Sequence, residues 1–349
     1  MISTSAYEIR ENASLAGRNG FRVAAKAALL ADVKRPEGLP ELLAMPFIRT
    51  TPLLLLGEGS NTLFAGDWHG VVLNIGTLGR KVLERDDDSG LLRAEAGERW
   101  DDVVRWSLAL GFSGLENLSL IPGTVGAAPV QNIGAYGTEI GEFIETVEAY
   151  DRQSNRIVRL SKAQCAFAYR DSIFKRDPSR YLVLAVELRL PRSRELRIDY
   201  PGLPEELAAM GAIGKPRASQ VAEAVARLRT RKLPNPDIEP NVGSFFRNPV
   251  VEAALADTLA KEHAGMPVYP SGAEATRKLS AAWLIEKAGW KGFRDGDAGV
   301  SEKHALVLVN RGNATGMQLL DLARRITASV QERFGVALEP EARIVGADF

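Results

Sequence analysis

The chain contains one cysteine and three histidines, and this scarcity excludes several kinds of site. Cys165 has no partner for an internal disulfide, as is typical of a protein in a reducing compartment. The histidines, at positions 69, 263 and 304, are scattered without metal-ligand spacing, so we expect no zinc site and no other metal. No apolar stretch approaches the length of a membrane span, and no hydrophobic signal segment follows Met1. We therefore expect a cytoplasmic protein without membrane insertion.

An excess of charge of either sign is missing as well. Lys plus Arg and Asp plus Glu each number 44, and the sequence pI is about 6.9. Such a balance provides no general attraction to nucleic acid or to an anionic membrane, so any basic site is local. The 349 residues exceed the length at which one hydrophobic core stops growing, which predicts two or three domains. We expect small-molecule substrates as partners, no nucleic acid, and a monomer.

The common nucleotide and hydrolase signatures are absent too. No segment fits the G-x-G-x-x-G dinucleotide fingerprint or the G-x-x-x-x-G-K-[ST] phosphate loop, so the Rossmann and P-loop interpretations lack their motifs. No G-x-S-x-G nucleophile elbow is present, which argues against a serine hydrolase of that kind. A phosphate site in this chain must belong to another fold.

What the chain does have is a glycine-rich loop, Ile121 to Gly137, with four glycines and two prolines among seventeen residues. Glycine permits positive φ and close approach of a ligand, and clustered backbone N–H groups form an anion site without basic side chains. A second loop of this character, Gly57 to Asn61, follows the apolar run Leu53 to Leu56, where the end of a strand would deliver it. Two such loops suit a diphosphate ligand.

The pattern of hydrophobic residues predicts a mixed α+β protein with mostly antiparallel strands. We expect the segment 191–215 to be turn-rich and irregular, and a domain boundary at the prolines that follow residue 232. The expected strands are 71–75, 91–96, 147–150, 157–160, 181–190 and 305–310, and the expected helices are 100–110, 218–232, 281–288 and 317–334.

Three segments combine polar residues that suit catalysis. Arg170 is either half of an ion pair, with Asp171 as the partner, or a cation for a substrate carboxylate. Ser244 either belongs to a turn with a hydrophobic anchor or presents a hydroxyl in a dry site walled by two phenylalanines. Glu341 is either a solvated charge or, on one strand face with Arg343, a group for proton transfer.

Lys232, at the end of the basic helix 218–232, has the same ambiguity. It is either a solvated residue at a helix end, where a cation complements the helix dipole, or a ligand of phosphate.

Taken together, these segments resemble the UDP-N-acetylenolpyruvoylglucosamine reductase family, and the resemblance spans nearly the whole chain. Its motifs occur in order: Leu-Gly-Glu-Gly-Ser-Asn at 56–61, the loop 121–137, Tyr-Arg-Asp-Ser-Ile-Phe at 169–174, Gly-Ser-Phe-Phe-x-Asn-Pro at 243–249, and Leu-Glu-Pro-Glu at 338–341. Two departures are Asn19-Gly-Phe21 where the family often has Asn-Thr-Phe, and Ala342 where valine is usual.

The resemblance implies an α+β fold with an FAD-binding domain of the vanillyl-alcohol oxidase type, followed by an α+β substrate-binding domain. By position, the FAD-binding domain covers 17–192, in subdomains 17–78 and 79–192, the segment 193–216 connects, and the substrate-binding domain covers 217–349. FAD would be bound non-covalently, because His69 and Cys165 lie outside both glycine loops. NADPH would be the co-substrate, in the reduction of an enolpyruvyl ether for peptidoglycan synthesis.

The resemblance also implies roles for individual residues. Arg170, Ser244 and Glu341 match the catalytic positions, with Arg170 and Glu341 polarising the substrate carboxylate and Ser244 supplying a proton. The positions implied to bind the substrate are Tyr169, Tyr200, Lys232 and Asn248. The positions implied to bind FAD are Gly57, Gly59, Ser60, Asn61, Pro122, Gly123, Gly126, Asn132, Gly134, Ala135, Tyr136 and Gly137.

Two other functions stay open on this evidence. An FAD-dependent oxidase of the same flavin-binding superfamily would use oxygen in place of NADPH and would not need Ser244. A noncatalytic nucleotide-binding module would retain the glycine loops but not Arg170, Ser244 and Glu341 together.

Overall fold

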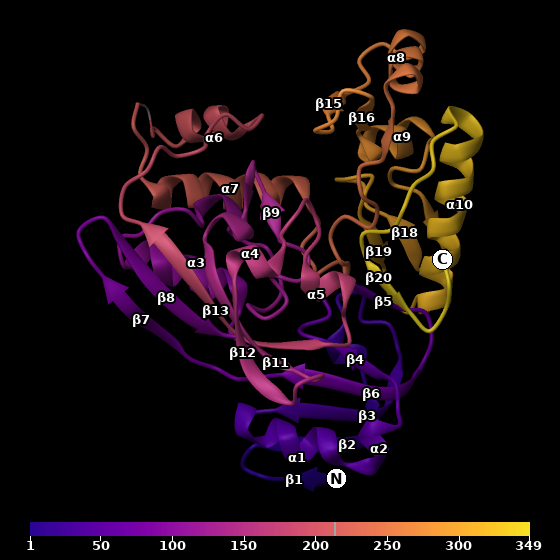
Figure 1. The fold of residues 1–349 in the computed structure, drawn as a ribbon. Helices are drawn as coiled ribbons and strands as arrows, with labels where there is room; N and C mark the ends of the chain where they lie inside the picture. Colours follow the sequence, from indigo (N-terminus) through magenta and orange to yellow (C-terminus); the bar gives the residue numbers. More distant parts are fainter. Residues whose placement is uncertain (213) are drawn as a thin grey trace. The chain divides into compact units, whose positions relative to one another are not determined.

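A computed structural model describes residues 1–212 and 214–349 and divides them into two compact units (Figure 1). The first unit contains 1–13, 27–58 and 69–230, and the second contains 14–26, 59–68 and 231–349. The chain therefore passes repeatedly between the units, and the loop Gly57 to Asn61 is divided between them. This division differs from the domain ranges expected from the sequence, which stay a prediction.

The first unit contains two five-stranded sheets. One has the order β1-β2-β3-β6-β4, and its β4 and β6 run parallel, with Leu53 opposite Val71. Its core residues include Tyr7, Val33 and Leu42, which are almost completely buried. The elements are β1 (Ile2–Ser3), β2 (Tyr7–Ser14), β3 (Lys26–Val33), β4 (Leu53–Leu55), β6 (Trp68–Ile75), α1 (Leu39–Ala44) and α2 (Pro46–Arg49).

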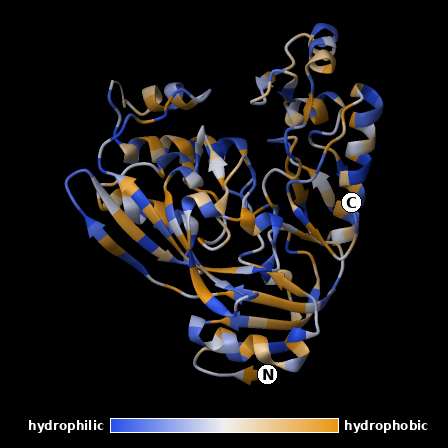
Figure 2. Ribbon diagram, in the orientation of Figure 1, coloured by the Kyte–Doolittle hydropathy of each residue, from blue (hydrophilic) through white to orange (hydrophobic). Residues whose placement is uncertain are grey.

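The other sheet is antiparallel throughout, in the order β12-β11-β13-β8-β7. Figure 2 shows hydrophobic residues recurring along its strands. Helix α3 (Trp100–Ala109) buries Trp100, Val103, Val104 and Ser107, the one-face spacing expected of an amphipathic helix. Trp100, Val103 and Val104 share a core with one face of the sheet. The strands are β7 (Arg80–Arg85), β8 (Ser89–Glu95), β11 (Ile144–Asp151), β12 (Arg156–Ser161) and β13 (Tyr181–Pro191).

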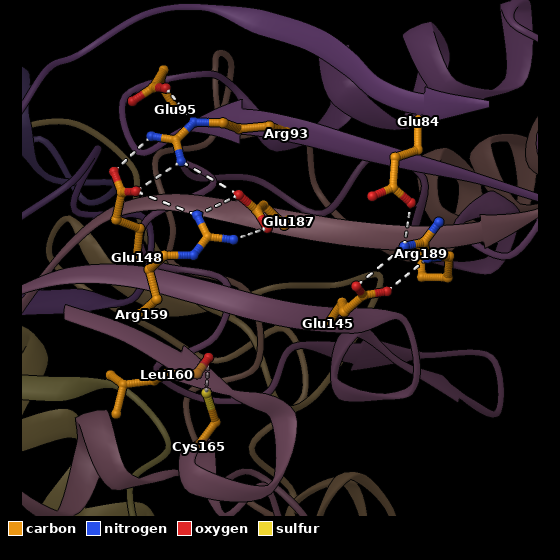
Figure 3. A network of polar contacts seen from close by, with 10 residues as sticks. All are labelled: Glu84, Arg93, Glu95, Glu145, Glu148, Arg159, Leu160, Cys165, Glu187 and Arg189. Carbon is orange, nitrogen blue, oxygen red and sulfur yellow. Dashed lines mark hydrogen bonds and ion pairs between the residues drawn. The ribbon is translucent and has the colours of Figure 1, made fainter.

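A network of charged side chains lies across four strands of this sheet (Figure 3). Arg93 Nη2 contacts Glu148 Oε1 at 2.7 Å, and Arg159 Nη2 contacts Glu187 Oε2 at 2.6 Å. Arg93 Nη1 also lies 3.5 Å from Glu187 Oε1, so the cations and carboxylates alternate. The Arg93 guanidinium holds the pKa of Glu148 below its ordinary value. Glu187 is only 2% exposed, and its two pairs with Arg93 and Arg159 compensate for the burial of its side chain.

The segment expected to be irregular, 191–215, contains a short helix, α6 (Leu203–Ala209). Gly202, with φ 93°, turns the chain at its start, and Leu203 and Leu207 pack on one face. They share a small core with Val221 and Leu228 of α7 (Ala218–Lys232), which agrees with the expected helix 218–232. The pattern missed α6 because one turn of apolar residues is too short to show a helical period.

Short elements complete the first unit. They are β9 (Gly134–Ala135), β10 (Thr138–Glu139), α4 (Lys162–Cys165) and α5 (Ile173–Arg176), together with 3-10 turns at 36–38, 116–118 and 140–142.

The second unit is built from small sheets and helices. A parallel pair joins β5 (Thr62–Phe64) to β20 (Arg343–Val345), with Arg343 opposite Thr62. The two three-stranded sheets are antiparallel, as expected for most pairs in this protein. Its other elements are β14 (Val250–Glu252), β15 (Val268–Pro270), β16 (Thr276–Leu279), β17 (Arg294–Asp295), β18 (Ala298–Val300), β19 (Leu308–Asn310), α8 (Ala253–Glu262), α9 (Ala281–Lys287), α10 (Gly316–Phe334) and a 3-10 turn at 16–18.

Two expected elements of the second unit compare closely with the structure. The expected helix 317–334 is α10, which begins with a capping box between Thr315 and Gln318 and ends at Gly335 with φ 67°. The expected strand 305–310 is shorter, because the Val307 N–H turns back to the His304 carbonyl at 3.0 Å before β19 begins. In the described part of the chain, no helix has the length and hydropathy of a membrane span.

Candidate cofactor and active site

The loop Gly57 to Asn61 exposes backbone N–H groups that have no acceptor among the described residues. This holds for Gly57, Glu58, Gly59 and Asn61, and Gly59 is buried. Buried backbone N–H groups are almost always paired, so the unpaired N–H of the buried Gly59 indicates a ligand that accepts hydrogen bonds. The donors are neutral and closely spaced, which suits the oxygens of a phosphate.

Gly59 is required by its surroundings. Its φ is +68°, and a Cβ at this position would lie 2.1 Å from the Arg18 carbonyl oxygen. The Gly20 N–H donates to the Gly59 carbonyl at 3.1 Å, so these two glycine segments of the second unit are bound together. Only glycine allows the loop to follow this path while its N–H stays unpaired.

In the first unit, the start of this loop packs against the glycine-rich segment 121–137. A Cβ at Gly57 would lie 2.8 Å from Thr124 Oγ1, and the Glu58 carboxylate accepts a hydrogen bond from the Gly123 N–H at 3.1 Å. The structure thus brings together the two segments that the sequence singled out. They are neighbours although about sixty residues separate them along the chain.

Most backbone N–H groups of the segment 121–137 donate inside the protein. The Val125 N–H donates to the Glu98 carbonyl at 2.9 Å, and the Gly126 N–H donates to the Ala96 carbonyl at 2.8 Å. A Cβ at Gly126 would lie 2.7 Å from the Ala96 Cβ, so this glycine serves close packing. The segment is therefore a rigid wall, and a larger share of the N–H groups is unpaired in the first loop than in this segment.

The Asn132 side chain is also committed inside the protein. Its Nδ2 donates to Glu139 Oε2 at 2.7 Å and to the Ala168 carbonyl at 3.0 Å, and its Oδ1 accepts from the Gly141 N–H at 2.9 Å. Asn132 is 1% exposed. It joins the glycine-rich segment to the chain that carries Arg170.

Arg170 lies against the same segment. Its Nη2 donates to the Gly134 carbonyl at 2.8 Å, and its guanidinium lies 5.5 Å from the centre of the exposed Tyr169 ring. Asp171, which was considered as the ion-pair partner of Arg170, pairs with Arg176 instead. Asp171 Oδ2 lies 2.9 Å from Arg176 Nε. The interpretation of Arg170 as half of a pair with Asp171 was therefore wrong.

Two further residues approach Tyr136 of this segment. The exposed Tyr200 packs edge to face on it, with ring centres 4.8 Å apart. The half-buried Arg229 of α7 lies near Tyr136 and Asp101 and has no hydrogen-bond or ion-pair partner among the described residues. Burial lowers the pKa of Arg229. Arg229 was not among the residues predicted from the sequence, where a run of arginines in the helix 218–232 is the feature that points to it.

Ser244 and Glu341 are brought together within the second unit. The Glu341 N–H donates to the carbonyl of Phe245 at 2.7 Å, and Phe246 forms an isolated β-bridge with Pro340. On its opposite edge, the same segment forms an isolated antiparallel β-bridge between Ser244 and Val307. The segment that carries Ser244 is thus the middle of three paired segments.

Packing immobilises this segment while leaving the hydroxyl of Ser244 unused. Phe245 and Phe246 are 0% and 1% exposed, and their ring centres lie 5.1 Å apart. The half-buried Ser244 Oγ has no hydrogen bond among the described residues. An unused hydroxyl on a rigid, apolar support suits controlled proton transfer.

The other predicted substrate contacts of the second unit are Lys232 and Asn248. Lys232 is exposed at the end of α7, and Asn248 Oδ1 accepts from the Ala281 N–H at 3.0 Å. His304, which the sequence analysis treated as scattered, accepts from the Leu306 N–H at its Nδ1, 3.2 Å away. Burial and the nearby Lys232 lower its pKa. Its signal in the sequence was its place just before the strand 305–310.

Two family models match the chain. An FAD binding domain model matches residues 28–161, and the model of the UDP-N-acetylenolpyruvoylglucosamine reductase C-terminal domain matches residues 235–345. No group of three or more His, Cys, Asp or Glu side chains that could hold a metal occurs among the described residues.

Curated relatives match over almost their whole length. A UDP-N-acetylenolpyruvoylglucosamine reductase of Xanthomonas euvesicatoria is 55% identical over 98% of this chain and 97% of its own. One of Xylella fastidiosa is 52% identical over 100% of this chain and 99% of its own. A solved structure of the reductase from Thermus caldophilus is 24% identical, with a TM-score of 0.64 over 97% of this chain and 98% of its own, and so has the same fold. With identities above one half along the whole chain, the protein belongs to the UDP-N-acetylenolpyruvoylglucosamine reductase family.

Proposed function

We propose that this protein reduces the enolpyruvyl ether of UDP-N-acetylenolpyruvoylglucosamine to UDP-N-acetylmuramate for peptidoglycan synthesis, with non-covalent FAD and with NADPH as the co-substrate. One observation carries the proposal: in a chain of this family, the unused Ser244 hydroxyl is fixed on two buried phenylalanines beside Glu341. We further propose a cytoplasmic monomer.

The residues present fit FAD. The unpaired N–H groups of Gly57 to Asn61 would hold its diphosphate, and the segment 121–137 would border the flavin ring. Of the residues proposed there, Gly59 and Gly126 need to be glycine for lack of space, whereas Asn132 would act through the backbone it shapes. When bound, FAD would supply the transfer of a hydride from NADPH to the methylene carbon of the substrate.

Arg170 would bind the substrate carboxylate. Its guanidinium is a planar donor fork that stays charged, and the hydrogen bond to the Gly134 carbonyl uses one of its nitrogens. When the methylene carbon gains a hydride, negative charge develops on the neighbouring carbon and spreads into the carboxylate. A fixed cation at the carboxylate stabilises that charge more strongly than it stabilises the substrate.

Ser244 would give its proton to the carbon that carries this charge. An alcohol is a weak acid, but a carbanion-like centre is a strong enough base when the two atoms are held in line. The new C–H bond completes the saturated ether, and the serine recovers a proton from water. Glu341, whose main-chain N–H donates to the Phe245 carbonyl, would in its protonated form donate a hydrogen bond to the carboxylate that Arg170 binds.

Four other residues would hold the rest of the substrate. Lys232 and Asn248 would contact the UDP-sugar, where an exposed ammonium suits a diphosphate. Tyr169 and Tyr200 are both exposed, and aromatic rings that are exposed in the free protein are suited to covering a ligand.

The proposal is tested by separating the two half-reactions in a stopped-flow instrument. The purified enzyme should oxidise NADPH in quantity only when the enolpyruvyl sugar nucleotide is present. Ser244→Ala should leave flavin reduction by NADPH within about twofold of wild type and slow reoxidation by the substrate about 100-fold or more. Ser107→Ala, which removes another buried hydroxyl from α3, is the control and should change neither rate.

Three outcomes would contradict parts of this proposal. Equal NADPH consumption without the sugar nucleotide would indicate an oxidase and remove the reductase assignment. Slowing of both half-reactions alike by Ser244→Ala would remove the proton-donor role. A preparation that stays colourless after incubation with FAD would remove the flavin itself.

A further inference from the structure

The ladder between β5 and β20 ends in an irregular way at Asn61. In a parallel pair, a residue bonds to the two residues that flank its partner. Arg343 is opposite Thr62, and its N–H donates to the Asn61 carbonyl at 2.9 Å. If the ladder continued by one step, the Glu341 carbonyl would accept from the main-chain N–H of Asn61. It accepts instead from the Asn61 side chain, whose Nδ2 lies 3.2 Å away.

This exchange of donors has two effects. The main chain of Glu341 is held on both sides. Its N–H donates to the Phe245 carbonyl at 2.7 Å, and its carbonyl accepts from the Asn61 side chain. The main-chain N–H of Asn61 is left out of the ladder and has no acceptor among the described residues. One side chain thus completes the ladder and keeps a donor for the loop Gly57 to Asn61.

We propose that Asn61 is a positioning residue for Glu341, whose side-chain amide fixes the Glu341 main chain so that the Asn61 N–H remains available to an anionic ligand. This inference rests on the proposed function, in which Glu341 acts on the substrate carboxylate. Asparagine suits the role because its side-chain amide can donate to the Glu341 carbonyl in place of the main-chain N–H of the same residue. Alanine has no donor, and aspartate would place a second acceptor against the Glu341 carbonyl.

The position of Glu341 depends on this bond. Phe245 is buried and restrains this chain, because its carbonyl accepts from the Glu341 N–H at 2.7 Å and from the Ala342 N–H at 3.4 Å. Without the Asn61 amide, the peptide that follows Glu341 is left with the longer of these two bonds, which is a weak restraint. A displacement of a catalytic group by about 1 Å can reduce a rate about 100-fold. Loss of the Asn61 amide should therefore slow the step that uses Glu341.

The test is a double-mutant cycle measured on the FAD-loaded enzyme. Asn61→Ala should slow reoxidation of the reduced flavin by the sugar nucleotide about 10- to 100-fold and leave reduction by NADPH within about twofold. In the Glu341→Ala background, Asn61→Ala should have no further effect beyond about twofold. Asn74→Ala removes a comparable amide bond, from Nδ2 to the Leu56 carbonyl at 3.1 Å, and should leave both rates unchanged.

Asn61→Asp provides a second variant that preserves size, and it should slow reoxidation as Asn61→Ala does. A readout that needs no turnover is amide exchange at Asn61 in the wild-type protein. Its N–H should exchange rapidly without FAD and become protected at least about tenfold when FAD binds.

The results that would overturn the inference are distinct from those that would overturn the proposed function. If Asn61→Ala slows reoxidation equally with and without the Glu341 carboxylate, Asn61 is merely structural. If Glu341→Ala slows reoxidation but both Asn61 variants do not, only this inference fails. Protection of the Asn61 N–H without FAD would mean that the ladder already binds it. If Glu341→Ala reoxidises at the wild-type rate, the proposed role of Glu341 fails first.

Discussion

Replacement of Gly59 by alanine should damage the protein more than its small size suggests. The φ of +68° belongs to the left-handed region, which costs an L-residue about 1–2 kcal/mol. The new Cβ would also lie 2.1 Å from the Arg18 carbonyl oxygen and 2.9 Å from the Asn19 Cα. Both contacts are with backbone, so the chain must move, and such overpacking costs about 1–3 kcal/mol. The free energy of unfolding should fall by about 2–5 kcal/mol in total.

Gly289→Ala separates the two contributions. Gly289 lies in the same unit and has a φ of +87°, but a Cβ there would have no atom within 4 Å. It should therefore cost only the conformational part, about 1–2 kcal/mol. Urea unfolding of the FAD-free wild type, Gly59→Ala and Gly289→Ala measures the steric part as the difference between the variants.

The same variants test the place of the loop in FAD binding. Movement of Gly59 displaces its N–H, so Gly59→Ala should weaken FAD binding at least about tenfold, or 1.4 kcal/mol, in a flavin fluorescence titration. Gly289→Ala should bind FAD as wild type does. Equal losses of stability in the two variants would refute the steric argument. Unchanged FAD affinity of a folded Gly59→Ala would refute the assignment of the loop.

Three further predictions concern the first unit. Glu187→Gln should lower the free energy of unfolding by about 1–3 kcal/mol, because it leaves Arg159 without its close carboxylate. The control Glu145→Gln, at an exposed residue, should lower it by under about 1 kcal/mol. Equal losses of the two variants in urea unfolding would contradict this. The Arg180 guanidinium lowers the pKa of Asp151 from 3.8 to about 2, so the stability it contributes is complete above pH 4 and is lost as the pH falls toward 2. Asp151→Asn should flatten that part of the pH dependence of the unfolding midpoint, and an unchanged slope would argue against the pair. Burial raises the pKa of Cys165 to about 12, so a thiol reagent should label it at pH 8 only after unfolding, and rapid labelling of the native protein would contradict the burial.

Local patterns predicted several of the longer regular elements of this protein. The long alternating run 181–190 became β13, and the amphipathic run 317–334 became α10, since each is long enough for its period to be read. Short elements were different. Helix α6 was missed, and the strand 305–310 began late, because a single hydrogen bond at Val307 decides where pairing can start.

The partners of charged residues could not be read from neighbours in the chain. Asp171 stands beside Arg170 in the sequence, yet it pairs with Arg176, five residues farther on. An arginine is long enough to reach several acceptors, and backbone direction decides among them. Arg229 and His304 were missed for the same reason, because their burial depends on distant segments.

The two glycine-rich segments and the α+β class can be read from the amino-acid sequence alone, because backbone freedom and hydrophobic periodicity are local properties. The residues proposed for catalysis were identified by resemblance to the family, since the chemistry of each side chain left a structural alternative open. The fold was needed to show that residues 59–68 belong with 231–349 and that Glu341 is bonded to Phe245 and Asn61. It was also needed to show that the N–H groups of Gly57, Glu58, Gly59 and Asn61 have no acceptor among the described residues. Hydrogen bonds between segments 280 residues apart depend on how the whole chain packs, and no local pattern records that packing.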